Sequence, residues 1–514
     1  MEKTTVPKKG FAAFKAHFKS DFSAGFSVSL IALPLCLGIA IASGMPPLAG
    51  LITAIIGGML ASRISGTFVT ISGPAAGLIV ISLGAVESLG YTNALGAILV
   101  AGIFVALFGL LKVGKIGDFF PLSAVHGMLA AIGIIIIVKQ IYPALGIANF
   151  KGSIFELAHK IPEKITKTNI NALLIAIETL CILIIHPFVR LKLIKLIPAP
   201  LWVLIFSIPT ALFIGTESLN MVDMPDDLFG DEGFTFPSFD KIVTGAFWIS
   251  VIGFALVSSI ESLLSAKAVD TLDPYKRKSN LDKDLLAMGL GSSIAASIGG
   301  LPMISEIVRS SANITYGAKT QWSNFFHGLF LLIFLFFGVV IIEMIPIAAL
   351  AAMLVFTGFK LASPKEFKHM YRIGFAQLSV FVITLIAVLA TDLIVGIAIG
   401  ILIEYMLLFT KGVKVSELFK AKLTTHKNTI NLQGSQTFSN YLSLKKSLDT
   451  ALESNEKLNL DFTDVRFIDH TVLKHLTNYQ LIAKQNKKDL IFKNLDILTP
   501  LSKHPLASRF NENT

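Results

Sequence analysis

Two ionisable side chains stand three residues apart inside the apolar part of the chain. Glu306 and Arg309 belong to GGLPMISEIVRSSANI, residues 299–314, which lies between two long apolar runs. Charged groups at membrane depth are costly and usually mark a functional site. On a helix this spacing allows an ion pair, and Arg309 alone would attract an anion. Both interpretations remain open, with the pair favoured because an unpaired Glu306 would repel an anion.

A second carboxylate follows a long apolar run. Glu261 stands in WISVIGFALVSSIESLLSAKAVD, with Ser265 one helical turn later on the same face. A carboxylate buried at this depth could carry a proton, or could hold Na⁺ together with hydroxyl and carbonyl oxygens. The alternative is a structural partner for Lys267 or Arg309. The sequence therefore predicts a coupling-ion site at Glu261 and Ser265.

Two short segments led by proline share one pattern. VTISGPAAGLIVI contains Pro74 and IGGLPMISEIVRSSAN contains Pro302, and each proline suits the first turn of a helix. A helix that begins inside a membrane points unsatisfied N–H groups and a positive dipole end at an anion. Small residues would let the ligand approach the backbone; they are Ser72, Gly73, Ala75, Ala76 and Ser305. Such paired interruptions indicate a transporter binding site, whereas ordinary helix kinks are the alternative.

The elements that must position these groups are membrane-spanning helices. The chain has 514 residues, of which 53% are hydrophobic and 15% charged, and its mean hydropathy is +0.71. Runs near the ~20 residues that cross a bilayer recur from about residue 22 to about residue 410. They predict about twelve to fourteen spans and exclude a soluble enzyme. We find no catalytic constellation, haem, nucleotide or metal-ligand motif, so we expect no enzyme activity and no cofactor.

The positive charge is distributed in a way that indicates topology rather than nucleic-acid binding. The net charge is +10, with Lys and Arg clustered at alternate span ends, and residues 216–240 carry acidic residues and no Lys or Arg. This pattern places basic loops inside. We therefore expect a bacterial inner membrane protein with both termini in the cytoplasm.

Three zones follow along the chain. Residues 1–20 form a basic cytoplasmic lead-in, residues 21–412 a membrane domain, and residues 413–514 a soluble tail. In the tail, TINLQ, KLNLDF and DLIFK predict strands, while NYLSLKKSLDTALES and HTVLKHLTNYQLIAKQ predict helices. This order indicates a small α/β module.

Together these stretches resemble one family over almost the whole chain. DFSAGFSVSLIALPLCLGIAIASGMPPLAGL, ISGPAAGLIVI, GGLPMISEIVRSSANITYGAKTQWS and LNLDFTDVRFIDHTVLKHL are similar to the SulP inorganic-anion transporters. The resemblance implies an all-α membrane domain of fourteen spans in two inverted repeats of seven, divided into core and gate domains. It also implies interrupted third and tenth spans, homodimers, elevator-type alternating access and a cytoplasmic α/β STAS domain (sulfate transporter and anti-sigma-factor antagonist).

The resemblance also assigns residues. It implies coupling-ion ligands at Glu261 and Ser265, where the similar cyanobacterial sodium-dependent bicarbonate transporters have Asp and Thr. Leu35 stands where many animal relatives have Gln, and Glu306 stands where small residues are usual. In the tail, Asp469 is retained and Thr471 matches a phosphorylatable hydroxyl, although packing or docking of a cytosolic partner is favoured over phosphorylation. The implied anion site comprises Leu35, Ser72, Gly73, Ala75, Ala76, Ser305, Glu306, Ile307 and Arg309.

The favoured function is secondary active transport of a small inorganic anion coupled to Na⁺ or H⁺. Bicarbonate ranks ahead of sulfate, chloride and dicarboxylates. An uncoupled anion channel or exchanger is one alternative. A membrane-anchored signalling scaffold that presents the tail is another.

Overall fold

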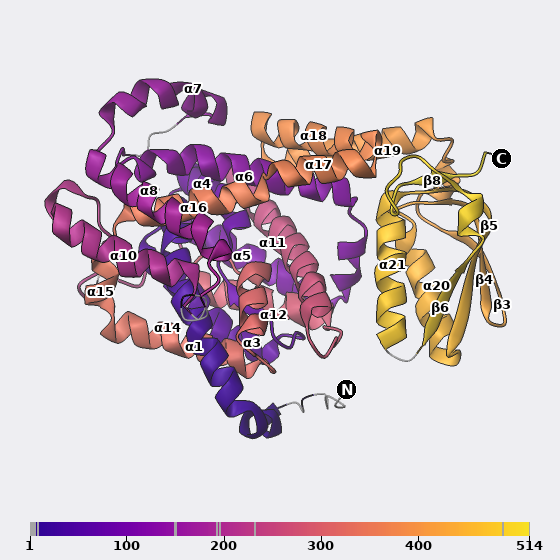
Figure 1. The fold of residues 1–514 in the computed structure, drawn as a ribbon, viewed down its shortest axis with the longest axis horizontal. Helices are drawn as coiled ribbons and strands as arrows, with labels where there is room; N and C mark the ends of the chain where they lie inside the picture. Colours follow the sequence, from indigo (N-terminus) through magenta and orange to yellow (C-terminus); the bar gives the residue numbers. More distant parts are fainter. Residues whose placement is uncertain are drawn as a thin grey trace. The chain divides into compact units, whose positions relative to one another are not determined.

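The computed structural model describes residue 7 and residues 10–148, 152–191, 194, 197–230, 233–485 and 488–512. The chain divides into two compact units, one of residues 1–114 and 132–361 and the other of residues 115–131 and 362–514. Figure 1 shows a helical part and a smaller part that contains a sheet.

The first unit is almost entirely helical. Its first helix, α1, runs without a break from Gly10 to Ala42, so residues 10–20 of the basic lead-in and the first apolar run share one helix. Short strands β1 (Ile71–Gly73) and β2 (Ile304–Glu306) interrupt the helical pattern. The helical elements between residues 47 and 89 are α2 (Pro47–Ile56), the π-helix η1 (Gly57–Ala61), α3 (Ser62–Ile64), the 3₁₀ turn η2 (Ala76–Leu78) and α4 (Ile79–Leu89).

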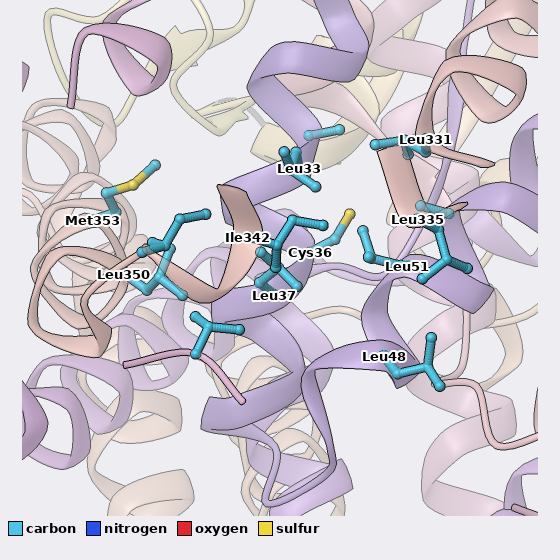
Figure 2. Packing of buried hydrophobic residues seen from close by; sticks show 14 of the residues in the cluster. Leu33, Cys36, Leu37, Leu48, Leu51, Leu331, Leu335, Ile342, Leu350 and Met353 are labelled. Carbon is cyan, nitrogen blue, oxygen red and sulfur yellow. The ribbon is translucent and has the colours of Figure 1, made fainter. Parts of the chain in front are cut away.

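The remaining α-helices of this unit follow along the chain. They are α5 (Tyr91–Leu110), α6 (Leu122–Ala144, which begins in the second unit), α7 (Ile154–Lys164), α8 (Ile170–Ile185), α10 (Ala199–Ile214), α11 (Gly245–Leu272), α12 (Leu281–Ala296), α13 (Ile307–Thr315), α14 (Trp322–Phe337), α15 (Val339–Glu343) and α16 (Ile347–Leu361). Helices α1, α2, α14 and α16 pack around a core that includes Cys36, Leu37, Leu51, Leu335 and Leu350 (Figure 2).

The second unit joins three helices to an α/β module. The helices are α17 (Pro364–Ile373), α18 (Phe375–Ala390) and α19 (Leu393–Thr410). The module contains β3 (Lys422–His426), β4 (Thr429–Gln436), α20 (Tyr441–Ser454), β5 (Lys457–Ile468), α21 (His470–Gln485), β6 (Asp489–Lys493), β7 (Thr499–Pro500) and β8 (Arg509–Phe510).

The tail's sheet is mixed. Strands β4, β5 and β6 are parallel, β3 pairs antiparallel with β4, and β8 pairs antiparallel with both β5 and β7. Apolar residues of β4, β5, α20 and α21 form its own core. The three strands and two helices predicted for the tail are confirmed, and β3, β7 and β8 are additional.

The described residues contain eight helices long and apolar enough to cross a membrane, and four apolar helices of 10–17 residues. One of the shorter ones is the η2–α4 segment, residues 76–89. The polytopic membrane domain predicted from hydropathy is therefore present. The fourteen-span arrangement remains a prediction.

Candidate functional site

The two proline-led segments meet as a two-stranded antiparallel sheet. Strand β1 pairs with β2, with Ser72 opposite Ser305 and Gly73 opposite Ile304. Each strand leads into a helix, β1 through η2 into α4 and β2 directly into α13. Because the strands run in opposite directions, the two helices leave the pair in opposite directions and their N-termini lie close to it. Their unsatisfied N–H groups are thus concentrated in one region.

The predicted placement of the two prolines in the first helical turn is wrong. The first helical residue after Pro74 is Ala76, and α13 begins at Ile307, five residues after Pro302. Strand pairing explains the difference, because residues 71–73 and 304–306 take an extended conformation to bond each other. The helix starts therefore lie beyond the prolines.

Arg309 connects the two segments. Its side chain is 2% exposed, and its Nε lies 3.5 Å from Oε2 of Glu306. Its Nη2 donates to the carbonyl of Pro74, and its Nη1 lies 3.3 Å from Sγ of Cys36. The ion pair inferred from the three-residue spacing is present, and the guanidinium also reaches the turn that leads into α4.

Glu306 has a second role at the start of α13. Its carboxylate accepts a hydrogen bond from the backbone N–H of Arg309 at 2.6 Å and so caps this helix. A carboxylate in this position is stabilised by the helix dipole. Glu306 thus satisfies one helical N–H and neutralises part of the charge of Arg309.

Glu261 lies beside Gly77, at the start of the η2–α4 segment. It belongs to α11, is 7% exposed, and packs so closely on Gly77 that a Cβ there would collide with its carboxylate. Within the described residues its Oε1 accepts no hydrogen bond. Arg309 pairs with Glu306 rather than with Glu261. A buried carboxylate oxygen that lacks a donor is suited to hold a proton or a small cation.

The hydroxyl of Ser305 is used inside the protein. It donates to both carboxylate oxygens of Asp284, at 3.0 and 2.8 Å, and the Ser305 backbone N–H donates to Oγ of Ser262 at 3.2 Å. Ser305 itself lies in β2, two residues before α13 begins, so its hydroxyl is not among the free donors of that helix N-terminus. Its backbone and hydroxyl are held by α11 and α12.

The remaining predicted residues lie in different environments. Ala75 is buried and Ala76 half-buried at the start of η2, while Ser265 is half-buried on α11. Leu35 packs against the apolar core, and Ile307 is 39% exposed at the first position of α13. The structure brings residues 72–76, residues 305–309 and Glu261 into neighbouring segments.

Several residues of this region were not found from sequence. Asp284 is fully buried and accepts hydrogen bonds from Ser65 and Ser305. Ser310 accepts from the N–H of Ile71 at 2.8 Å, and Asn324 lies 3.4 Å from Oγ of Ser72. Asp284 follows Lys283 near the start of α12 and resembles an ordinary acidic residue of a first helical turn. Its apolar neighbours Leu285, Leu286 and Ala287 were the available signal of burial.

In the tail, Asp469 and Thr471 lie at the start of α21. Asp469 caps this helix by accepting from the N–H of Val472 at 2.7 Å. Burial raises the pKa of its carboxyl to about 7. Thr471 is 3% exposed, and its hydroxyl accepts from the N–H of Leu122 at 3.3 Å. A buried, hydrogen-bonded hydroxyl favours the packing role over phosphorylation.

Comparison with known proteins places this chain in a family. Residues 18–384 match the sulfate permease family. The chain belongs to this family, also called SulP. It is 30% identical over 402 residues to the putative sulfate transporter YvdB of Bacillus subtilis, covering 76% of this chain and 73% of that protein. It is 25% identical over 469 residues to the bicarbonate transporter BicA of Picosynechococcus, covering 88% and 77%.

Solved structures show the same fold. The transmembrane domain of a cyanobacterial BicA superposes with a TM-score of 0.69 at 24% identity, covering 76% of this chain and 99% of that one. The anion transporter Slc26a9 in its inward-facing state gives a TM-score of 0.67 at 13% identity and covers 96% and 90%. The SulP chain described here is therefore a multi-pass membrane protein with a transporter fold and a strand-containing C-terminal region.

Proposed function

We propose that this SulP protein is a secondary active transporter of a small inorganic anion, with bicarbonate favoured over sulfate, chloride and dicarboxylates. The observation that carries the proposal is the β1–β2 pair, from which two helices start beside the buried guanidinium of Arg309. Its relatives include both bicarbonate and putative sulfate transporters.

The electrostatics of the pair suit an anion of low charge. Each helix N-terminus is equivalent to roughly half a positive charge and stabilises an anion by about 0.3–1 kcal/mol, or up to about 2 kcal/mol when partly buried. Arg309 adds a full positive charge, which Glu306 partly offsets at 3.5 Å. Residues 72–76 and 305–309, with Leu35 beside them, form the anion site in this proposal.

Coupling is assigned to Glu261 with Ser265. The carboxylate lies against Gly77, at the start of the helix whose N-terminus faces the anion. Binding of a proton or Na⁺ there would remove a negative charge next to the anion site, so the two ligands would bind more tightly together than alone. The partial positive charge of the helix would then act on the anion alone.

The decisive experiment measures uptake by purified protein in liposomes with Na⁺ and H⁺ gradients imposed separately. We expect bicarbonate uptake under at least one gradient, and Glu261→Gln should lose the gradient-driven component. Glu217→Gln, at an exposed position of the 3₁₀ turn Thr216–Ser218, is the matched control and should transport normally. Absence of flux under either gradient would contradict the transport proposal, and gradient-independent flux in the unmodified protein would establish an uncoupled channel or exchanger.

The larger architecture belongs to the same proposal. We infer fourteen spans in two inverted repeats, in a homodimer that works by elevator-type alternating access, in a bacterial inner membrane with both termini cytoplasmic. The antiparallel pairing of β1 with β2 supports the inversion, because corresponding segments of inverted repeats run in opposite directions. The tail, residues 413–514, is proposed as a STAS domain that docks a cytosolic partner.

A further inference from the structure

A polar cavity lies in the first unit, among segments that the anion site does not use. Its volume is about 280 Å³, and its lining comes from the start of α1, residues 63–68, the loop between α11 and α12, the first turn of α12, and residues 320–322 at the start of α14. Three of its lining side chains are basic: Arg63, Arg277 and Lys283. Among the described residues that line it there is no Asp or Glu.

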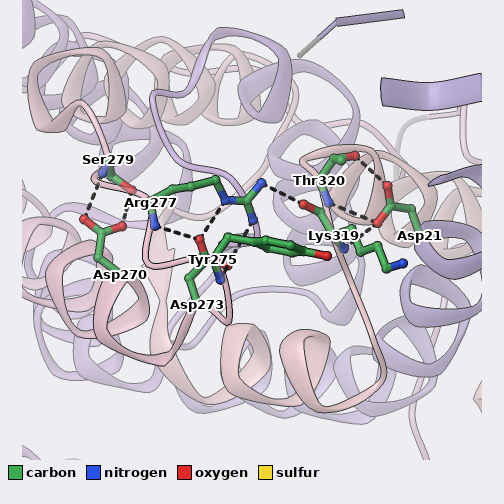
Figure 3. Close-up of polar contacts among 8 residues, drawn as sticks. All are labelled: Asp21, Asp270, Asp273, Tyr275, Arg277, Ser279, Lys319 and Thr320. Atoms are coloured by element: carbon green, nitrogen blue, oxygen red, sulfur yellow. Dashed lines mark hydrogen bonds and ion pairs between the residues drawn. The ribbon is translucent and has the colours of Figure 1, made fainter. Parts of the chain in front are cut away.

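The guanidinium of Arg277 is held in place by Asp273 and by a backbone carbonyl. Asp273 binds it through two oxygens, at 2.7 and 3.0 Å, and its Nη1 donates to the carbonyl of Lys319 at 2.8 Å (Figure 3). The Asp273 carboxylate itself is 2% exposed. This arrangement fixes the orientation of the cation at the wall of the cavity.

Arg63 is fixed by different contacts. Its guanidinium lies 3.9 Å from the centre of the Trp322 ring and donates to the carbonyl of Gln321 at 2.7 Å. Within the described part of the chain it has no carboxylate in ion-pair contact. The nearby Asp21 accepts from the N–H groups of Lys319 and Thr320 and from the Thr320 hydroxyl (Figure 3). Arg63 is therefore an oriented cation that makes no ion-pair contact with a carboxylate of the described residues.

The cavity also adjoins an aromatic strip. Trp322, which lines the cavity, contacts Phe14 with ring centres 4.7 Å apart. The contacts continue along α1 through Phe18 and Phe22, which are 44% and 40% exposed. Phe26 follows one turn later at 42% exposure. Exposed aromatic rings on a membrane helix suit contact with lipid.

Two oriented guanidinium groups and one ammonium form a binding set for phosphate oxygens. Guanidinium forks match phosphate geometry, and Lys adds a mobile point charge. We propose that this cavity is a binding site for a phosphoryl group, carried by an anionic phospholipid or by a soluble phosphate compound. The aromatic strip would accommodate acyl chains of the lipid. The site is separate from the β1–β2 anion site and does not depend on the proposed transport function.

The test is equilibrium binding to the purified full-length protein in detergent, with soluble short-chain dioctanoyl phosphatidic acid and inorganic phosphate as separate probes. We expect saturable binding of at least one probe. Arg63→Gln should weaken it about tenfold, which corresponds to the loss of one hydrogen bond to a charged group. Lys283→Gln should also weaken it, and because Lys283 is exposed that variant keeps the fold intact.

Lys278→Gln is the matched control, since Lys278 is an exposed cation of the loop between α11 and α12 and is not among the residues that line the cavity. It should bind as the unmodified protein does. Binding of phosphatidic acid alone identifies a lipid headgroup site, and equal binding of inorganic phosphate identifies a soluble ligand; both results support the proposal. Unchanged binding in both Arg63→Gln and Lys283→Gln, an equal loss in Lys278→Gln, or no binding of either probe would overturn it.

Discussion

Arg309 shows how one buried side chain can serve two segments of the same site. It is paired with Glu306, the residue that caps its helix, and hydrogen-bonded to the carbonyl of Pro74 on the other segment. Gly73 leaves room for this contact, because a Cβ there would lie 3.0 Å from Nη1 of Arg309. The Arg309 guanidinium is therefore held in one position at the turn before α4.

Removing Arg309 should impair both stability and transport. Breaking a buried ion pair costs about 3–5 kcal/mol, because the remaining charge loses its partner. The exposed fraction of the Glu306 side chain is 17%, so we expect the lower end of that range for Arg309→Ala. The measurements are thermal unfolding in detergent and anion uptake in liposomes.

The double variant Glu306→Ala/Arg309→Ala tests the pair. It should recover part of the lost uptake, since no uncompensated carboxylate then faces the anion. Recovery should be incomplete, because the Pro74 carbonyl still lacks its donor. If the double variant transports less than Arg309→Ala alone, Glu306 contributes to the site independently of Arg309.

At the scale of elements, the site depends on strands too short to be stable alone. Strands β1 and β2 have three residues each, and surrounding helices hold them in place. Ser310 of α13 and Ser262 of α11 accept their N–H groups, while Asp284 of α12 accepts the Ser305 hydroxyl. The geometry of the proposed anion site is thus set by side chains from three helices.

Asp284→Ala should destabilise this arrangement. The hydroxyls of Ser65 and Ser305 would lose their acceptor, at about 1–3 kcal/mol for each buried group left unsatisfied. Thermal unfolding in detergent should show a lower midpoint, with a smaller loss in Asp284→Asn because the amide keeps one acceptor oxygen. Asp223→Ala, at an exposed loop position, is the control. A midpoint unchanged in Asp284→Ala would mean that β2 is held by other contacts.

At the scale of the whole molecule, the chain combines a membrane unit with an α/β module that has its own core. Within the second unit, two buried groups at the start of α21 respond to pH in opposite directions. Burial raises the pKa of Asp469 to about 7 and lowers the pKa of His470 to about 4. The protonated carboxyl of Asp469 stabilises the folded state at low pH. This contribution to stability is lost as pH rises from about 4 to 7. The neutral imidazole of His470 contributes to stability above pH 6.5, and this contribution is lost as pH falls from about 6.5 to about 4.

Asp469→Asn should therefore change the pH dependence of the tail's stability. Without the carboxyl, the free energy of unfolding should rise more steeply between pH 4 and 7 than in the unmodified protein, by up to about 1.4 kcal/mol per pH unit. A tryptophan at Phe492, in a full-length chain whose three native tryptophans are replaced by Phe, reports urea unfolding of this module. Identical slopes in the two proteins would show that Asp469 does not titrate in this range.

Much of the fold and part of the site could be predicted from sequence. Apolar runs identified the membrane domain, and alternating patterns located three strands and both helices of the tail, because hydrophobic periodicity records burial locally. The spacing of Glu306 and Arg309 indicated their ion pair, because side chains three residues apart in a helical segment are neighbours. The depth of Glu261 in its apolar run pointed to a buried carboxylate.

Only the tertiary structure decided what these residues contact. The pairing of β1 with β2 joins residues more than 230 positions apart, and strands of three residues have no periodic signal. The contacts of Arg309 with Pro74, of Glu261 with Gly77 and of Ser305 with Asp284 likewise link distant segments. Sequence alone thus determined that the chain is a membrane protein, that its tail is an α/β module, and which charged residues lie in its apolar part. Long-range packing decided where the helices of the site begin, because extended backbone in the two segments is stabilised only when they meet.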